Sequence, residues 1–138
     1  MAYMNQTKKA IISNLMKPIL KKYGVKATLS VDNMSTINLN IKSSKYDFVG
    51  IYNKKNKEDQ AWRFPEQTFY PRKHLELSAG WVSDSFEGEE LAFFQEAFEA
   101  LQGAGYYNNT DSQSDYFDTA YYFYIKVGQW DKPYQMVA

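Results

Sequence analysis

Few side chains in this sequence combine the types and the spacing that enzyme catalysis requires. The chain holds no cysteine and a single histidine, His74, which stands beside Arg72 and Lys73 with no nucleophile motif near it. Nucleophilic catalysis by a serine and a histidine needs the base within hydrogen-bond reach of the nucleophile. A surface histidine is the simpler interpretation, so the sequence names no catalytic residue.

Carboxylates are the remaining candidates for chemistry. Asp111 and Asp115 are spaced like the first ligands of a calcium-binding loop. Such a loop needs a glycine at its sixth position and a glutamate at its last, where this chain has Tyr116 and Tyr122. We therefore predict no metal and no cofactor. A carboxylate- or metal-dependent enzyme remains the alternative, and it would gather Asp111, Asp115 and Asp118 in one pocket.

A set of tyrosine, asparagine and lysine side chains offers binding chemistry instead. Residues 25–42 read as two antiparallel strands joined by a turn, because aliphatic and polar residues alternate in both halves. Residues 120–127 alternate in the same way. If these strands join one sheet, their polar positions share an open face. The predicted binding face comprises Lys26, Thr28, Ser30, Asn38, Asn40, Lys42, Tyr122, Tyr124 and Lys126.

This binding face fits two kinds of partner and one structural role. Aromatic rings with amides and lysines on an open sheet are what single-stranded nucleic acid stacks on. Tyrosine is also common where proteins dock, with its ring on apolar surface and its hydroxyl in water. The competing explanation is that tyrosine is simply a good strand residue at half-exposed positions. We expect a protein partner first, with nucleic acid as the alternative.

Two helices are predicted to cover the aliphatic face of the sheet. Apolar residues recur at helical spacing over residues 5–23, where Pro18 predicts a kink or a break into two short helices. Residues 84–102 form the second helix, and Asp84 with Glu87 reads as a capping box at its start. Both helices would shield the aliphatic side and leave the tyrosine side bare.

The stretch between the hairpin and the second helix has a less regular pattern. Residues 46–52 are predicted as a third strand, followed by an exposed basic loop at residues 54–57. Residues 58–80 are predicted as a long irregular loop, because two prolines interrupt them. The aromatic residues expected to anchor this loop to the core are Trp62, Phe64, Phe69 and Tyr70.

These elements predict one α+β domain that spans residues 1–138. Its small antiparallel sheet would have three to four strands with two main helices packed on one face, in the order helix, strand, strand, optional strand, loop, helix, strand. A chain of 138 residues can bury a sufficient core without disulfides or metals. The absence of cysteine, and of any apolar run long enough to span a bilayer, favours a cytoplasmic protein with no membrane partner.

Charge is split between the two halves of the chain, although the net charge is zero. Residues 1–82 carry 14 Lys and Arg against 6 Asp and Glu, whereas residues 83–138 carry 2 against 10. The split would serve a basic surface for nucleic acid, an acidic surface for a basic partner, or attraction between the halves within the fold.

Three stretches of the chain also resemble a known domain family. They are residues 17–24 (Lys-Pro-Ile-Leu-Lys-Lys-Tyr-Gly), the hairpin at residues 30–42, and residues 110–134 with their Asp-Tyr-Phe-Asp and Val-Gly-Gln-Trp-Asp-Lys-Pro-Tyr runs. The family is a large polyvalent protein-associated domain (type twenty-nine) of bacteriophages and other mobile elements. The chain departs from its pattern at Met34, in place of a histidine, and at Gln129, in place of a basic residue. The residues that the pattern marks are Asp115, Tyr116, Phe117, Gly128, Trp130, Lys132, Pro133 and Tyr134.

This resemblance implies a biological context more than a chemistry. Members travel with invading DNA, or are expressed early from it, and act against host processes; no catalytic residue can be carried over. The resemblance implies a non-enzymatic accessory protein of the host cytoplasm that binds a host or phage macromolecule, in counter-defence or host takeover. A host or phage protein is the expected partner, with nucleic acid or a second copy of the chain as alternatives. The marked residues would equally serve folding, by holding the terminus to the core.

Overall fold

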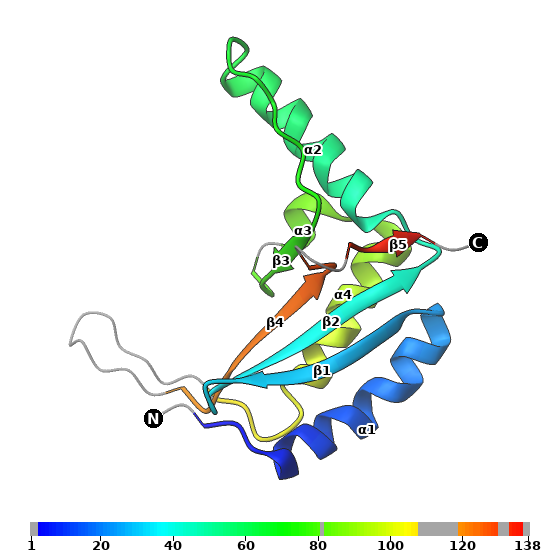
Figure 1. The fold of residues 1–138 in the computed structure, drawn as a ribbon, viewed down its shortest axis with the longest axis vertical. Helices are drawn as coiled ribbons and strands as arrows, with labels where there is room; N and C mark the ends of the chain where they lie inside the picture. Colours follow the sequence, from blue (N-terminus) through cyan, green and yellow to red (C-terminus); the bar gives the residue numbers. More distant parts are fainter. Residues whose placement is uncertain (1–2, 81, 108–118, 130–132, 137–138) are drawn as a thin grey trace, which may run out of the picture.

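The computed structural model describes residues 3–80, 82–107, 119–129 and 133–136, which form a helical layer on one sheet (Figure 1). The elements are α1 (Gln6–Tyr23), β1 (Lys26–Asp32), β2 (Thr36–Ser44), α2 (Phe48–Arg63), β3 (Leu75–Leu77), α3 (Val82–Ser85), α4 (Gly88–Leu101), β4 (Tyr122–Val127) and β5 (Gln135–Met136). The predicted α+β class, with helices packed against a sheet, is confirmed. No helix in the described ranges has the length and apolar character needed to cross a bilayer.

The sheet is mixed, whereas the sequence predicted an antiparallel one. Its strand order is β1-β2-β4-β3, and β5 pairs with β2. The β1–β2 hairpin is antiparallel, as predicted. Strands β3 and β4 also pair antiparallel, but β2 and β4 run parallel. A parallel pair needs a long crossover connection, and here the chain passes through α2, α3 and α4 before it returns as β4.

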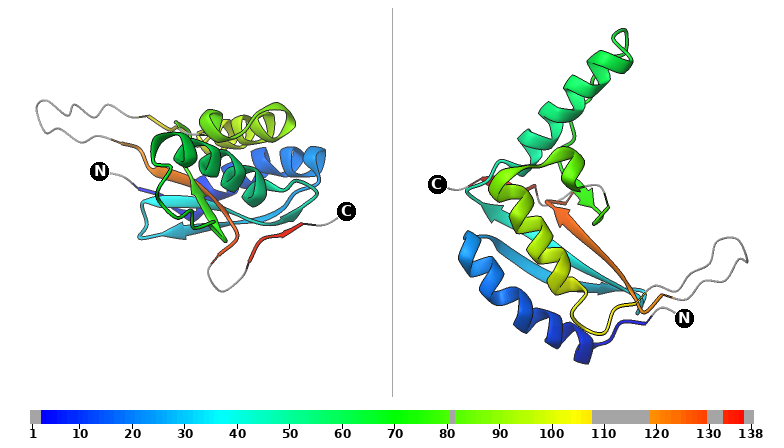
Figure 2. Two further views of the ribbon diagram at one scale, coloured as in Figure 1. Left: turned by 90° about the horizontal axis from the view of Figure 1, so that it is seen from above. Right: turned by 180° about the vertical axis from the view of Figure 1, so that it is seen from behind.

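The hydrophobic core lies between the sheet and helices α1 and α4, which occupy the same side of the sheet (Figure 2). Alternate residues of the strands face this side, because successive side chains of a strand point to opposite faces. The buried strand residues are Ile37, Leu39, Ile41, Leu75, Leu77, Ile125 and Val127. The helices bury Ile12, Met16, Phe93, Phe94, Ala97 and Leu101 against them.

Helix α1 begins and ends as the sequence predicts but does not break. The Asn5 side chain accepts a hydrogen bond from the Lys8 amide (2.8 Å), and Gly24 ends the helix in the left-handed conformation. The helix nevertheless continues through Pro18. Pro18 and Asn14, whose carbonyl loses its partner, are both on the exposed side, where water can take over the missing hydrogen bond.

The basic and acidic halves of the chain meet where α1 contacts α4. Lys22 Nζ lies 3.2 Å from Glu96 Oε1, and the Tyr23 hydroxyl also donates to the Glu96 carboxylate. The Tyr23 and Lys22 hydrogen bonds together hold the pKa of Glu96 below its ordinary value. Part of the charge split therefore serves attraction within the fold.

The second predicted helix is divided in two. Val82–Ser85 forms α3, Gly88–Leu101 forms α4, and Glu87 precedes α4 without a side-chain capping bond. The predicted capping box at residues 84–87 is therefore wrong. Phe86 turns inward between the two helices and is buried, and Gly88 takes a positive φ of 63° that ends any continuous helix at this point.

The predicted strand at residues 46–52 is instead the start of α2. The Asp47 side chain accepts a hydrogen bond from the Gly50 amide (3.1 Å) and so caps this helix. A short apolar run fits a strand or a helix equally well by its period. The capping bond stabilises a helix here. The prediction of a basic loop at residues 54–57 is therefore wrong, because these residues lie within α2.

Helix α2 extends away from the sheet, and the chain returns alongside it (Figure 1). We call residues 53–74, which include most of this helix and the returning segment, the α2 arm. The predicted anchors Trp62, Phe64 and Tyr70 are exposed, and Phe69 is half-buried. The prediction that they pack on the core is wrong, because the arm carries them beyond its reach.

An aromatic cluster joins the base of α2 to α4. Phe48 is fully buried at its centre. The rings within 6.1 Å of Phe48, measured between centroids, are those of Tyr46, Phe86, Phe93, Phe94 and Tyr134. Such ring pairs contribute about 0.5–1.5 kcal/mol each beyond the area they bury, so the base of the arm is firmly held.

The turn of the β1–β2 hairpin is of the kind that matches strand twist. Asn33 and Met34 have positive φ values of 54° and 53°, and the Ser35 amide donates to the Asp32 carbonyl (3.2 Å). Two consecutive positive φ values define a type I′ turn. Asparagine tolerates this conformation, but methionine does so only at a cost.

Candidate functional site

The candidate site is the side of the sheet opposite α1 and α4, which we call the outer sheet face. Figure 2 shows that these two helices leave it uncovered. The strand register brings the predicted side chains into rows: Ser30, Asn38 and Tyr124 are aligned, as are Thr28, Asn40 and Lys126. Tyr122 lies opposite Thr36 in a third row. Side chains from three strands that are far apart in sequence thus share one surface.

A hydrogen-bond network links the polar side chains of this face. Asn38 Nδ2 donates to Asp32 Oδ2 (2.6 Å), and Asn40 Nδ2 donates to Ser30 Oγ (2.9 Å). Lys126 Nζ lies 3.9 Å from the same Asp32 oxygen. Asp32 is not among the residues predicted for the binding face, so sequence reasoning missed this role. The signal was available, because Asp32 continues the polar alternation of Thr28 and Ser30.

Two predicted contact residues are not open to a partner. Asn38 is 1% exposed and Asn40 is 9% exposed, so the expectation of a fully open polar face is wrong for them. Both amides are engaged within the sheet, Asn38 by Asp32 and Asn40 by Ser30. Since β2 lies between β4 and β1, the Lys126 side chain must extend across β2 to come within 3.9 Å of Asp32.

One acceptor in this network is unused. Asn38 Oδ1 is buried and accepts no hydrogen bond from any part of the chain that the structure describes. A buried acceptor without a partner costs about 1–3 kcal/mol. The Asp32 carboxylate, which holds the other end of the same amide, is therefore the contact that keeps Asn38 in place.

The accessible part of the outer sheet face surrounds these buried amides. Tyr122 is 45% exposed, Lys42 and Thr28 are exposed, and Tyr124 and Lys126 are half-buried. Lys26 is also exposed but lies beyond an irregularity in the β1–β2 register. The face therefore presents tyrosine rings and lysine ammonium groups at its rim rather than amides at its centre.

A groove of about 550 Å³ opens at one end of this face, next to β5. It is lined by Thr28, Asn40, Ile41, Lys42, Ser43, Gly128, Gln129, Pro133 and Gln135. A smaller hollow of about 290 Å³ adjoins it and includes His74, Glu76 and Lys126. Two residues that the family pattern marks, Gly128 and Pro133, thus lie beside the predicted binding residues.

Two of the family-pattern residues, Gly128 and Tyr134, make close contacts within the fold. Gly128 has a φ of 74°, and a Cβ atom there would lie 2.7 Å from the Tyr134 amide nitrogen. The Tyr134 hydroxyl donates to the Tyr46 carbonyl (2.6 Å) and also bonds the Ser44 hydroxyl. Burial raises the pKa of Tyr134. These contacts hold the C-terminal segment against the end of β2.

Several predicted residues lie outside the described residues. They are Asp111, Asp115, Tyr116, Phe117, Asp118, Trp130 and Lys132. Within the described ranges, no group of three or more histidine, aspartate or glutamate side chains could hold a metal ion.

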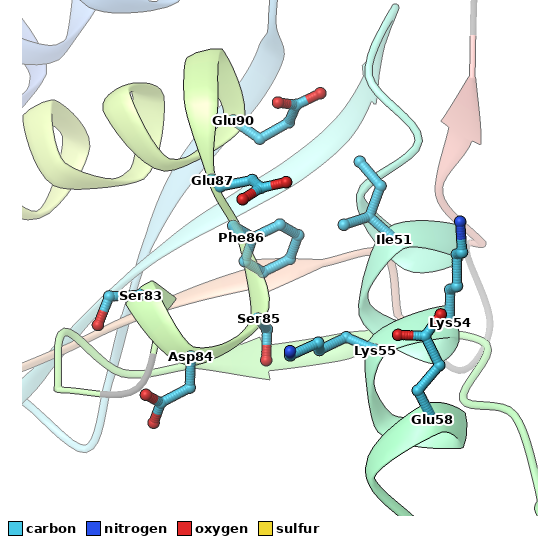
Figure 3. Close-up of a pocket in the computed structure, with 10 residues that line it drawn as sticks. All are labelled: Ile51, Lys54, Lys55, Glu58, Ser83, Asp84, Ser85, Phe86, Glu87 and Glu90. Carbon is cyan, nitrogen blue, oxygen red and sulfur yellow. The ribbon is translucent and has the colours of Figure 1, made fainter.

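A further cavity, of about 530 Å³, lies between α2 and the corner of α3 and α4 (Figure 3). Helix α2 contributes Ile51, Lys54, Lys55 and Glu58, and the corner contributes Ser83, Asp84, Ser85, Phe86, Glu87 and Glu90. In Figure 3 the Lys55 ammonium group extends across the cavity towards Ser85, and the Phe86 ring lies between the two walls. The charges are mixed, and no histidine lines the cavity that could activate either serine as a nucleophile.

The resemblance to a phage domain family remains an expectation from the sequence, and the outer sheet face has to be interpreted from its own residues. Neither the family models, nor the curated proteins, nor the solved structures include a match to this chain.

Proposed function

We propose that this protein is a non-enzymatic accessory protein of a phage or other mobile element, and that it binds a host or phage protein through the outer sheet face. The observation that supports it most directly is the position of Tyr122 and Tyr124, side by side along β4 on a face that α1 and α4 leave uncovered. Tyrosine is among the residues that contribute most to protein–protein binding. The phage context follows from the sequence resemblance.

The charge of the outer sheet face favours a protein over nucleic acid. Lys126 is paired with Asp32, and Glu76 lies opposite Lys126 in the β3–β4 register. Single-stranded nucleic acid needs a groove with surplus positive charge and accessible side chains. Because Asn38 and Asn40 are buried, they cannot contact bases. The nucleic-acid alternative therefore has less support at this face than a protein partner.

A matched pair of tyrosines tests the proposal. Tyr122 and Tyr107 have the same exposed fraction, 45%, but only Tyr122 is on the outer sheet face. Affinity capture from host lysate with the tagged protein would be compared for the unaltered chain, Tyr122→Ala and Tyr107→Ala. We expect Tyr122→Ala to lose the captured protein and Tyr107→Ala to retain it.

The same experiment can overturn the proposal. Equal capture by Tyr122→Ala and the unaltered chain would show that the outer sheet face is not the contact. If the unaltered chain captures no protein from lysates of host or infected cells, a stable protein partner is excluded.

A further inference from the structure

We propose that the α2 arm is a binding site for single-stranded nucleic acid. Trp62 and Tyr70 have the largest exposed fractions of all large hydrophobic side chains in the described residues, 85% and 80%, and Phe64 between them is 55% exposed. Exposed rings of this size add nothing to the core, and a group of them marks an interaction site. Trp62 lies in the last turn of α2 and Phe64 directly follows that helix, at the end farthest from the sheet (Figure 1), whereas Tyr70 lies on the returning segment.

The arm also carries surplus positive charge. Its six cationic side chains are Lys54, Lys55, Lys57, Arg63, Arg72 and Lys73, against the three acidic side chains of Glu58, Asp59 and Glu66. The two ion pairs found among the described residues join Lys22 to Glu96 and Lys126 to Asp32, so neither involves the arm. Arg72 stacks over the Tyr52 ring, 6.0 Å from its centre, but none of the six cations is neutralised by a carboxylate within the described residues. Such cations are available to phosphate groups, and releasing the counterions of phosphates drives nucleic-acid binding.

Hydrogen bonds hold the arm in a defined shape. Asn53 clamps the returning segment, because its Nδ2 donates to the Arg72 carbonyl and its Oδ1 accepts from the Arg72 amide, both at 2.8 Å. Further out, Gln60 Nε2 donates to the Gln67 carbonyl (3.2 Å). The rings are thus presented on a preorganised support, and binding pays less ordering entropy than it would on a flexible loop.

A surface hollow on the arm brings two lysines beside an aromatic ring. Asn53, Lys54, Lys57, Phe69 and Pro71 line a cavity of about 490 Å³ between α2 and the returning segment. Phosphates can lie against the two lysines while bases stack on the exposed rings. Stacking needs unpaired bases, because the faces of paired bases are covered by their neighbours in a duplex. The rings therefore favour a single strand over a duplex.

This proposal does not depend on the function proposed for the outer sheet face. The two surfaces share no residue, and the substitutions that test them differ. A protein that uses both would bring a protein partner and a nucleic-acid strand together.

Fluorescence anisotropy with labelled oligo-dT and oligo-U tests the proposal on the full chain at low salt. We expect binding of at least one strand, and a loss of about tenfold or more in affinity for the Trp62→Ala/Tyr70→Ala variant, since each stacked base contributes substantially. Lys54→Gln/Lys57→Gln should weaken binding as well. The controls are Tyr107→Ala and Lys17→Gln, which remove an exposed tyrosine and an exposed lysine elsewhere. Comparing the two oligonucleotides distinguishes DNA from RNA as the ligand.

Three outcomes would overturn this proposal. The first is an absence of binding to either strand at low salt. The second is an unchanged affinity in the ring variant. The third is equal binding of polyglutamate or of a duplex, because the arm would then act only as a charged surface for an acidic protein or for any polyanion. Circular dichroism checks that the variants remain folded.

Discussion

The outer sheet face and the α2 arm both combine aromatic and cationic side chains, but these side chains differ in how far they are exposed and paired with carboxylates. On the outer sheet face, Lys126 is paired with Asp32, and the asparagine bonded to the same aspartate is buried. On the arm, Trp62 and Tyr70 are exposed and the cations have no ion pair among the described residues. The difference shows that composition alone does not define a binding surface. What also matters is how far the fold has already paired the charges and how much of each ring it leaves exposed.

The largest expected difference between the two surfaces is in how strongly salt weakens binding to each of them. Binding of a single strand falls with salt by a slope of about 0.7 per neutralised phosphate, so about four contacts and a roughly fourfold rise in salt predict a loss of about 50-fold. Protein capture by the outer sheet face should change little, because burial of tyrosine rings is not screened. Anisotropy and capture measured over one salt series check this. Equal salt sensitivity would remove the distinction between the surfaces.

Removing the Asp32 carboxylate should destabilise the outer sheet face. Asp32→Ala leaves the buried Asn38 amide without its acceptor, and we expect the free energy of unfolding to fall by about 1–3 kcal/mol. Urea denaturation measures the loss. Asp32→Asn keeps an acceptor and should cost less, since a partly exposed ion pair contributes about 0–1 kcal/mol. The control Glu58→Ala, on the arm, should change the free energy of unfolding by less than about 0.5 kcal/mol. A larger loss in this control would contradict the view that carboxylates stabilise the outer sheet face but not the arm.

Loosening the clamp on the arm should have a local effect. Asn53→Ala removes both hydrogen bonds to Arg72, so hydrogen exchange at the Arg72 amide should accelerate while global stability falls by about 1 kcal/mol or less. Limited proteolysis between residues 64 and 72 gives a second readout. The control is Asn56→Ala, because the Asn56 amide bonds the Tyr52 carbonyl within α2 (2.8 Å) and does not reach the returning segment. If hydrogen exchange and proteolysis are the same in both variants, the Asn53 hydrogen bonds do not hold the returning segment in place.

The smallest expected effect is an increase in stability. Met34→Gly relieves a left-handed backbone at the turn that positions Asp32, and it should raise the free energy of unfolding by about 0.5–1 kcal/mol. Thr68→Gly on the arm is the control, since the only non-glycine residues with positive φ in the described ranges are Asn33 and Met34. A loss of stability in both variants would show that Met34 is not strained. Thermal or urea unfolding resolves a change of this size.

The sequence predicted those elements whose hydrophobic period is long and unambiguous. The hairpin, β4 and α1 all follow from alternation or helical spacing, and α1 (Gln6–Tyr23) has nearly the predicted bounds of residues 5–23. The residues after Tyr46 were mistaken for a strand because a short apolar run has no decisive period. The Asp47 cap, with Gly50 three residues later, was the local signal for a helix.

The features that escaped prediction depend on contacts between distant segments. Asn38 is buried and bonded to Asp32, and Lys126 approaches the same carboxylate from β4; no local pattern encodes these contacts between strands. The parallel pairing of β2 with β4 depends on the path of the chain through three helices. Trp62 and Tyr70 were assigned to the core from their hydrophobicity, which is a sound rule only where a core is within reach.

The parallel partnership of β2 and β4 also has a consequence for synthesis of the chain. β2 is complete at Ser44, but the strand that occupies its second edge begins only at Tyr122. On the ribosome, the nascent hairpin therefore carries bare amide and carbonyl groups along that edge while most of the remaining chain is made. A prematurely terminated product that lacks β4 would keep this edge open, and it should self-associate rather than accumulate as a monomer.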